Sequence, residues 1–421
     1  MEKKKRIISI VLLMLMMALF VAPSFSGGKD KMKDRRDLFA GYDDFEPMTL
    51  YLATDMHYIA PSLTDGGEYY SNMIRNGDGK FMPYCSEINE AMIEKVIKDR
   101  PAAFIVSGDL TFNGAKVSHE EYSQMLRRVG NAGIPVLAIP GNHDLTIKRA
   151  ARFKGDTYEL VKSIDASEYL EMYVDYGRED SYDFDATSLS YIYEAAPNLR
   201  ILCVDVNTVA GMSGILTPGT LKFVEEQLIK AKEDRAYVIS VTHQTLLTHS
   251  ELTRQGMSFI DSDKLLELYE KYNVLMNLSG HMHIQHIAVS EGGVPDIATG
   301  ALLTSPNYYG VITLEGKRVR YEARSLDVAA VPDFANNAHE FLWDNAFRQG
   351  KENIEGEDAD EMAGFFADFN VAYIAGRSDM IPWDDEVMKK WKKTDSFVPY
   401  YFELVQKEGA HDYTHFEMEL E

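Results

Sequence analysis

Residues 136–144 read VLAIPGNHD, an apolar run that passes directly into Gly-Asn-His-Asp. A short apolar run with β-branched residues predicts a buried strand, and the polar residues begin where that strand ends. The same arrangement recurs at four other places, as LYLATDMH at 50–57, AFIVSGD at 103–109, YVISVTH at 237–243 and VLMNLSGHMH at 274–283. These five segments determine both the predicted fold and the predicted site.

Predicted strands and predicted helices alternate along the chain from Met48 onward. A sixth apolar run, at 201–204, also reads as a strand, and the segments between the runs have helical periodicity. Two of these segments contain helix-start signals, a capping box of Ser118 with Glu121 and the pair Thr217-Pro218. Strands that alternate with helices indicate an α/β protein with helices on both faces of a layered sheet.

The polar clusters contain residue types that bind metal ions through nitrogen or oxygen. In an open α/β sheet, ligands bind at the carboxyl ends of the strands, so we expect the clusters to converge at one edge. The set is larger than one ion needs, which implies two ions, and a carboxylate such as that of Asp109 can bridge them. The candidate ligands are Asp55, His57, Asp109, Asn142, His243, His281 and His283.

A single histidine at the end of a strand is more often a structural residue than a metal ligand. The metal interpretation is favoured here because five of the 11 histidines fall within the clusters, in a constant position relative to the strands. The remaining histidines are predicted to be ordinary surface or capping residues, with His286 the one that could lie near the site. They are His119, His249, His286, His339, His411 and His415.

Taken together, the clusters resemble the complete motif set of the calcineurin-like metallophosphoesterases, with the likeness extending over residues 48–325. The resemblance implies a β-sandwich flanked by helices and a cofactor of two divalent or mixed-valence ions, Mn, Fe or Zn. By position, the first ion would be held by Asp55, His57, Asp109 and His283. The second would be held by Asp109, Asn142, His243 and His281.

The residues that follow two of the motifs resemble exported bacterial members similar to 3',5'-cyclic nucleotide phosphodiesterases. These residues are APSL at 60–63, GDLTFNG at 108–114 and SHEE at 118–121. The resemblance implies a C-terminal helical domain and a small phosphoester substrate, with a cyclic nucleotide as the leading candidate. Two alternatives remain open, a phosphomonoesterase acting on nucleotides or phosphoproteins, and a metal-binding protein without turnover.

The expected nucleophile is a hydroxide that bridges the two ions, because water shared between close cations loses a proton near neutral pH. Attack on phosphorus expels an alkoxide, which needs a proton. His143 lies beside Asn142 in the sequence and is the predicted proton donor. Asp144 has two interpretations, either orienting His143 or capping the following segment as a turn residue.

The N-terminal segment, residues 1–26, has the pattern of a secretory signal peptide. Basic residues at 3–6 precede an apolar run at 7–22, and small residues follow it. An uncleaved membrane anchor is the alternative, although the apolar run is shorter than the roughly 20 residues of a spanning helix. Residues 27–47 read as a linker. We therefore expect an exported protein, secreted or associated with the cell envelope, with no membrane segment in its mature form.

The last segment, residues 326–421, contains all three tryptophans with helical spacing and more acidic than basic side chains. It is predicted to be an acidic, mostly helical C-terminal domain. The whole chain has 43 basic and 66 acidic residues and a formal charge of -23, which argues against generic binding of nucleic acids or anionic membranes. Its two cysteines provide no disulfide framework, and Cys203 is expected to be a buried thiol.

Overall fold

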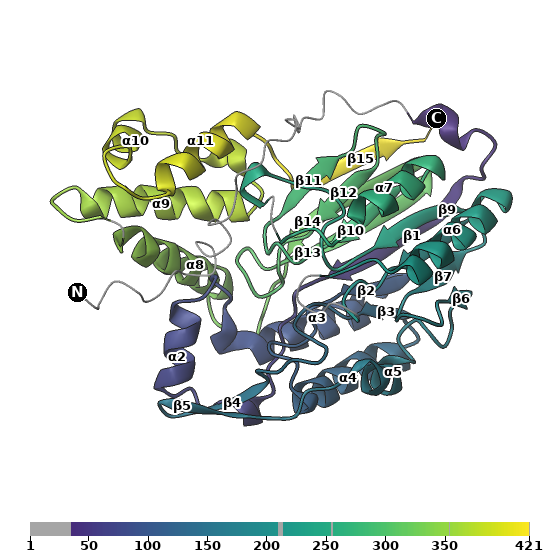
Figure 1. Ribbon diagram of the computed structural model, residues 1–421, viewed down its shortest axis with the longest axis horizontal. Coiled ribbons are helices and arrows are strands. Elements are labelled where there is room, and N and C mark those ends of the chain that lie inside the picture. Colours follow the sequence, from purple (N-terminus) through teal and green to yellow (C-terminus); the bar gives the residue numbers. More distant parts are fainter. Residues whose placement is uncertain (1–34, 209–213, 254–255, 353, 421) are drawn as a thin grey trace.

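The computed structural model describes residues 35–208, 214–253, 256–352 and 354–420, and it contains two sheets that pack against each other (Figure 1). The strand order is β15-β14-β13-β1-β2-β3 in one sheet and β11-β12-β10-β9-β8-β7-β6 in the other. Leu52, Ile105, Ile201 and Ile239 are wholly buried in one apolar cluster between the sheets. The β-sandwich implied by the family resemblance is therefore confirmed, rather than a single layered sheet.

All six predicted strands are present and have neighbours in the parallel parts of the two sheets. β1, β2 and β3 pair in parallel in the first sheet, and β8, β9, β10 and β12 pair in parallel in the second. The first sheet consists of β1 (Phe45–Ala53), β2 (Ala103–Ser107), β3 (Val136–Ile139), β13 (Tyr308–Gly316), β14 (Arg318–Ser325) and β15 (His415–Glu419). The second consists of β6 (Asp183–Phe184), β7 (Tyr191–Ala196), β8 (Leu199–Cys203), β9 (Tyr237–Val241), β10 (Met276–Ser279), β11 (His286–Val289) and β12 (Pro295–Ala298). A separate ribbon pairs β4 (Ala151–Lys154) with β5 (Thr157–Leu160).

Helices flank the sandwich, as the alternation of segments predicts. They are α2 (Glu68–Arg75), α3 (Cys85–Asp99), α4 (Lys116–Asn131), α5 (Ala166–Tyr173), α6 (Pro218–Glu233), α7 (Ser262–Lys271), α8 (Phe334–Lys351), α9 (Ala359–Ile374), α10 (Asp385–Trp391) and α11 (Val398–Glu408). Thr217 caps α6 by accepting a hydrogen bond from the backbone N–H of Thr220, as predicted. The predicted capping box is wrong, because α4 begins before Ser118. The Ser118 hydroxyl instead accepts the N–H of Ala60 at 3.0 Å.

The predicted signal peptide lies outside the described residues, and the described part of the predicted linker is packed on the second sheet. Arg35 is buried and donates hydrogen bonds to the carbonyls of Val274, Leu275 and Gly293. Phe39 is also buried, in contact with the ring of Tyr237. The folded region therefore starts before residue 48, because these residues satisfy polar and apolar groups of the second sheet. Among the described residues no helix is long and apolar enough to cross a membrane.

The C-terminal helices α8 to α11 lie together at one end of the molecule (Figure 1). Their own apolar core contains Phe366, Phe369, Trp391 and Phe402. After α11, however, the chain returns to the sandwich as β15, which pairs antiparallel with β14. Residues 326–421 are therefore not helical throughout, and their last strand extends the first sheet.

Candidate metal centre

The predicted ligands all follow the carboxyl ends of parallel strands. Asp55 and His57 follow β1, Asp109 follows β2, and Asn142 follows β3, all in the first sheet. The second sheet supplies the other ligands at the ends of β9 and β10, namely His243, His281 and His283. The structure brings these side chains from the two sheets together in two adjoining groups.

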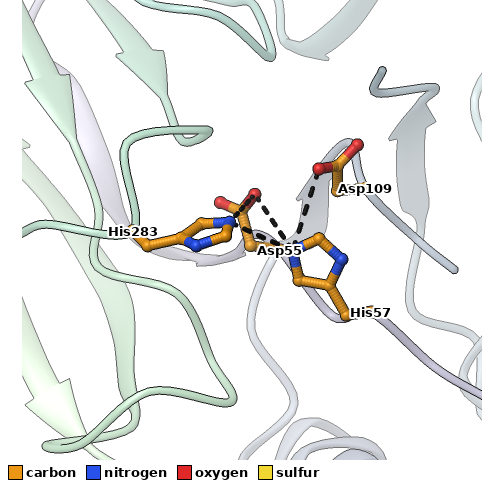
Figure 2. A group of neighbouring side chains, drawn as sticks. All are labelled: Asp55, His57, Asp109 and His283. Carbon is orange, nitrogen blue, oxygen red and sulfur yellow. Dashed lines mark hydrogen bonds and ion pairs between the residues drawn. The ribbon is translucent and has the colours of Figure 1, made fainter. Parts of the chain in front are cut away.

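The first group consists of Asp55, His57, Asp109 and His283, whose candidate ligand atoms lie within 4.8 Å of one another (Figure 2). The Nε2 atoms of His57 and His283 are 3.0 Å apart, and His283 Nε2 is 3.2 Å from Asp55 Oδ1. Asp55 Oδ1 is buried and has no hydrogen-bond partner. An orphaned carboxylate oxygen beside two convergent imidazole nitrogens is a donor set that fits a cation.

The second group shares Asp109 with the first and adds His243 and His281, again with ligand atoms within 4.8 Å. His243 Nε2 lies 3.2 Å from Asp109 Oδ1 and 2.9 Å from Asn142 Oδ1. His243 Nδ1 donates to the carbonyl of Ser107 at 2.9 Å, which directs Nε2 toward the group. Asp109 is thus placed to serve two ions, as the sequence suggested.

Neighbouring charges hold the carboxylates of both groups ionised. Burial is the largest single effect and opposes ionisation of Asp109, but the surrounding histidines, His243 foremost, together keep the pKa of Asp109 well below its usual value. Burial likewise opposes ionisation of Asp55, yet His283 lowers its pKa. Two of the four imidazoles respond in the opposite direction: burial lowers the pKa of His243 and His283, but Asp109 and Asp55 respectively raise each to about 9. At His57 and His281 burial prevails and lowers the pKa. The carboxylates therefore favour positive charge at both groups, which suits cation binding.

The backbone of the site has an unusual conformation. Asp55, His57, Asp109, His281 and His283 all have positive φ, between 38° and 65°. This left-handed region costs non-glycine residues about 1–3 kcal/mol each and is concentrated at functional sites. The sharp turns that it produces aim ligands separated by one residue, such as His281 and His283, toward the two different groups.

Close approach of the loops also requires glycine immediately before two of the ligands. A Cβ on Gly141 would lie 2.2 Å from the backbone nitrogen of Asp109. A Cβ on Gly280 would lie 1.9 Å from Thr54 Oγ1 and 2.6 Å from Asp55 Oδ2. A side chain at either position would separate strand ends that must meet for the ligands to converge.

His143 lies at the edge of the two groups, with about a third of its side chain exposed. Its backbone N–H donates to Asp109 Oδ1 at 2.8 Å, and its Nε2 is 4.0 Å from Asp109 Oδ2. Its Nδ1 donates to the carbonyl of Phe112 at 2.8 Å, so Nε2 is the ring nitrogen that remains free for chemistry.

Asp144 is wholly buried and has a structural role in this site. Its carboxylate accepts the backbone N–H groups of Gly141, Leu110 and Thr111, which ties the loop after β2 to the loop after β3. The carbonyl of Phe112, not Asp144, orients the His143 ring. Burial and the charge of Asp109 raise the pKa of Asp144 to about 7. These contacts are all with residues that precede Asp144, so they match neither an orienting contact to the His143 ring nor a cap on the following segment.

Three histidines outside the clusters were wrongly predicted to be surface or capping residues. His119, His249 and His286 are all buried, whereas His339 and His415 are exposed as expected. His286 stacks on Tyr413 and contacts His249 rather than the candidate ligands. Each of the three finds a buried partner that is distant in sequence, and nothing in the local pattern indicates such a partner.

Sequence reasoning also missed a carboxylate that contacts a candidate ligand. Asp78 Oδ2 lies 2.9 Å from His283 Nδ1 and 2.6 Å from the ammonium of Lys80. Both residues belong to the segment NGDGK at 76–80, whose composition indicates a turn and nothing more. Only the folded chain shows that this turn reaches the site.

Comparisons with known proteins give a family match and structural likenesses. The profile of the calcineurin-like phosphoesterase family matches residues 48–285. A dimetal phosphatase from Danio rerio has a similar structure, with 13% identity, a TM-score of 0.49, and coverage of 67% of this chain and 98% of the other. A purple acid phosphatase from yellow lupin has 15% identity, a TM-score of 0.40, and coverage of 66% and 52%. A search of curated proteins found no match.

Proposed function

We propose that this protein hydrolyses small phosphodiesters, with cyclic nucleotides as the leading substrate class. The premise is that the chain belongs to the calcineurin-like phosphoesterase family and is a metal-dependent phosphoric ester hydrolase. The observation that carries the metal-dependent hydrolysis, as distinct from the preference for diesters, is the shared position of Asp109. It joins two groups of nitrogen and oxygen donors, and the free Nε2 of His143 faces the same carboxylate.

The two groups would hold one ion each. Asp55, His57, Asp109 and His283 would hold the first, and Asp109 would hold the second together with Asn142, His243 and His281. When bound, such a pair supplies Lewis acids that neutralise phosphate oxygens and lower the pKa of water. Manganese, iron and zinc suit this mixture of imidazole and oxygen donors, which contains no sulfur.

His143 would be the catalytic residue that acts on the leaving group. Its ring is fixed by the Phe112 carbonyl at Nδ1, so Nε2 can carry a proton toward the substrate from a partly exposed position. An alkoxide is a poor leaving group, and proton donation by a positioned imidazole assists its departure.

The preference for diesters is supported by the sequence around the motifs. The segments at 60–63 and 108–114 resemble exported bacterial cyclic nucleotide phosphodiesterases more closely than the shared metal motifs require. The site motifs themselves suit monoesters equally well, because the same pair of ions serves both reactions. Substrate assays must therefore distinguish diesterase from monoesterase activity.

The test is a substrate panel on purified protein loaded separately with Mn²⁺, Zn²⁺ or iron. Bis-p-nitrophenyl phosphate is compared with p-nitrophenyl phosphate, and 3',5'-cyclic nucleotides are compared with linear nucleotides. We expect the larger kcat/KM for the diesters and for the cyclic nucleotides. A larger kcat/KM for monoesters would replace the proposal with a phosphomonoesterase, and no turnover by metal-replete protein would indicate a binding protein.

We also propose that the protein is exported, secreted or held at the cell envelope. The support is the order of basic, apolar and small residues in segment 1–26. Mass spectrometry of the protein recovered from its native host would give the mature N-terminus. A chain that still begins at Met1 in the cytoplasmic fraction would contradict export.

A further inference from the structure

The turn between α2 and α3 reaches the far side of the candidate ligand His283. Asp78 Oδ2 accepts a hydrogen bond from His283 Nδ1 at 2.9 Å, while His283 Nε2 faces Asp55 Oδ1 at 3.2 Å. A carboxylate at one ring nitrogen fixes the tautomer and the orientation of the ring, and leaves the other nitrogen as the ligand atom. Lys80 contacts the same Asp78 oxygen and compensates its negative charge.

This turn is held in place by the C-terminal helix α8. Asn345, which is buried, donates to the carbonyl of Arg75 at 2.8 Å, and Gln349 donates to the carbonyl of Gly77 at 3.2 Å. Gly79 has a φ of 85°, and a Cβ there would lie 2.4 Å from Leu342 Cδ1. Residues on both sides of Asp78 in the sequence therefore lie against α8.

Aromatic packing extends the same contact to the end of the turn. The Phe81 ring lies 5.1 Å from that of Phe341 and 6.1 Å from that of Phe334, both on α8. Phe81 itself is buried and its N–H donates to the carbonyl of Leu303. The turn is thus fixed between α8 and the sandwich, with few ways to move Asp78 away from His283.

The loop that carries His283 also rests on the C-terminal helices. Two residues after His283, the backbone N–H of Gln285 donates to the carbonyl of Ile374, the last residue of α9, at 3.0 Å. The Gln285 side chain donates to the carbonyl of Tyr413 at 2.8 Å. Both the ligand loop and the turn that supports it therefore depend on the segment after residue 326.

We propose that Asp78 is a positioning residue for the metal ligand His283, and that α8, by holding the turn of Asp78, makes the C-terminal region a structural part of the first metal site. The inference rests on the proposed function only in taking His283 as a metal ligand. The C-terminal helices would then support the metal site directly and would not be a separate module.

The first test removes the carboxylate. Asp78→Ala should weaken binding of Mn²⁺ or Zn²⁺ to the first site by about 10–100-fold, the usual effect of losing a partner of a ligating histidine. Asp78→Asn keeps an oxygen that can accept from Nδ1–H and should retain most of the affinity. Calorimetric titration of metal-free protein measures both. The matched control is Asp99→Ala, since Asp99 also pairs with a lysine, Lys95.

A second readout separates positioning from folding. Nitrogen-15 spectra of metal-free protein, recorded well above pH 9 so that the His283 ring is neutral, report which ring nitrogen carries the proton. We expect the Nδ1–H form in the wild type and in Asp78→Asn, and a mixture of tautomers in Asp78→Ala at an unchanged melting temperature. Unchanged metal affinity together with an unchanged tautomer in Asp78→Ala would overturn the assignment of Asp78.

The role of α8 is tested at a distance from the ligands. The double variant Asn345→Ala with Gln349→Ala should weaken metal binding to the first site several-fold and leave the second site unaffected. Glu340→Ala, on the exposed side of α8, is the control. Equal affinities in the double variant and the control would contradict the role of α8. Because metal binding is measured without substrate, these results are independent of which ester the enzyme cleaves.

Discussion

At the scale of single residues, Asp109 and His143 are neighbours with different expected roles. The Asp109 carboxylate belongs to both donor groups, whereas the His143 ring belongs to neither and places Nε2 4.0 Å from Asp109 Oδ2. Removing the Asp109 carboxylate should therefore weaken metal binding, and removing the His143 ring should slow the hydrolysis step.

We predict that Asp109→Ala loses activity and at least one ion. His143→Ala should keep both ions and lower kcat by about 10²–10⁴-fold, the range for a positioned proton donor. Elemental analysis of the purified variants, with steady-state kinetics on a diester, checks both statements. Undiminished turnover in His143→Ala would remove that residue from the proposed mechanism.

His119 illustrates a residue-scale effect on stability. Its ring is buried, contacts Tyr173 Oη at 3.0 Å, and donates from Nε2 to the carbonyl of Asp144. Burial lowers its pKa to about 4, below the ordinary value near 6.5. Between these values the unfolded chain binds a proton that the folded chain does not. The contribution of His119 to stability is therefore complete above pH 6.5 and is lost as the pH falls toward 4.

We predict that His119→Gln is less stable than the wild type at pH 7.5, and that this difference shrinks as the pH falls to 5. Urea unfolding at several pH values measures it, and the slope that His119 adds should approach about 1.4 kcal/mol per pH unit. The matched control is His339→Gln, at an exposed position of α8. Parallel profiles for wild type and His119→Gln would refute the assignment.

At the scale of elements, β15 was not foreseen among the helices of the C-terminal region. Its sequence, HFEME at 415–419, alternates exposed and buried side chains, with Phe416 and Met418 directed into the core between the sheets. The run is short and half polar, so its period of two is a weak signal beside long helical segments. The strand forms because β14 would otherwise be an unpaired edge of the first sheet, and β15 pairs with that edge.

We predict that Met418→Ala lowers the free energy of unfolding by about 2–5 kcal/mol, as truncation of a buried methionine does. Glu417→Ala, one position away on the exposed face, removes only ion pairs with Arg318 and Arg320 and should cost less than about 1 kcal/mol. Denaturant unfolding of both variants gives the comparison. Equal losses would mean that β15 contributes little to the core.

At the scale of the whole molecule, the candidate ligands come from both sheets of the sandwich. β1, β2 and β3 supply Asp55, His57, Asp109 and Asn142, and β9 and β10 supply His243, His281 and His283. Ions held between the sheets would link them, and binding to the folded state alone raises stability.

We predict that a chelator abolishes hydrolysis and lowers the melting temperature, and that Mn²⁺ or Zn²⁺ restores both. At a free metal concentration of 100 times Kd, the gain in stability is about 2.7 kcal/mol per site. Activity assays and calorimetry on the same samples, with metal content verified, provide the measurement. Hydrolysis that persists after complete metal removal would contradict the metal-dependent mechanism.

The sequence by itself determined the central strands, the helix faces and the residue types at the strand ends. Hydrophobicity and periodicity are local properties of the sequence, so the run that ends in Gly141-Asn142-His143-Asp144 shows both a strand and its polar end. Tertiary structure alone decided three other features. Asp78 contacts His283, although the two residues are 205 positions apart. β15 pairs with β14, and buried histidines such as His286 find partners distant in sequence. The physical reason is that such contacts depend on the path of the whole chain, and a short sequence pattern does not determine that path.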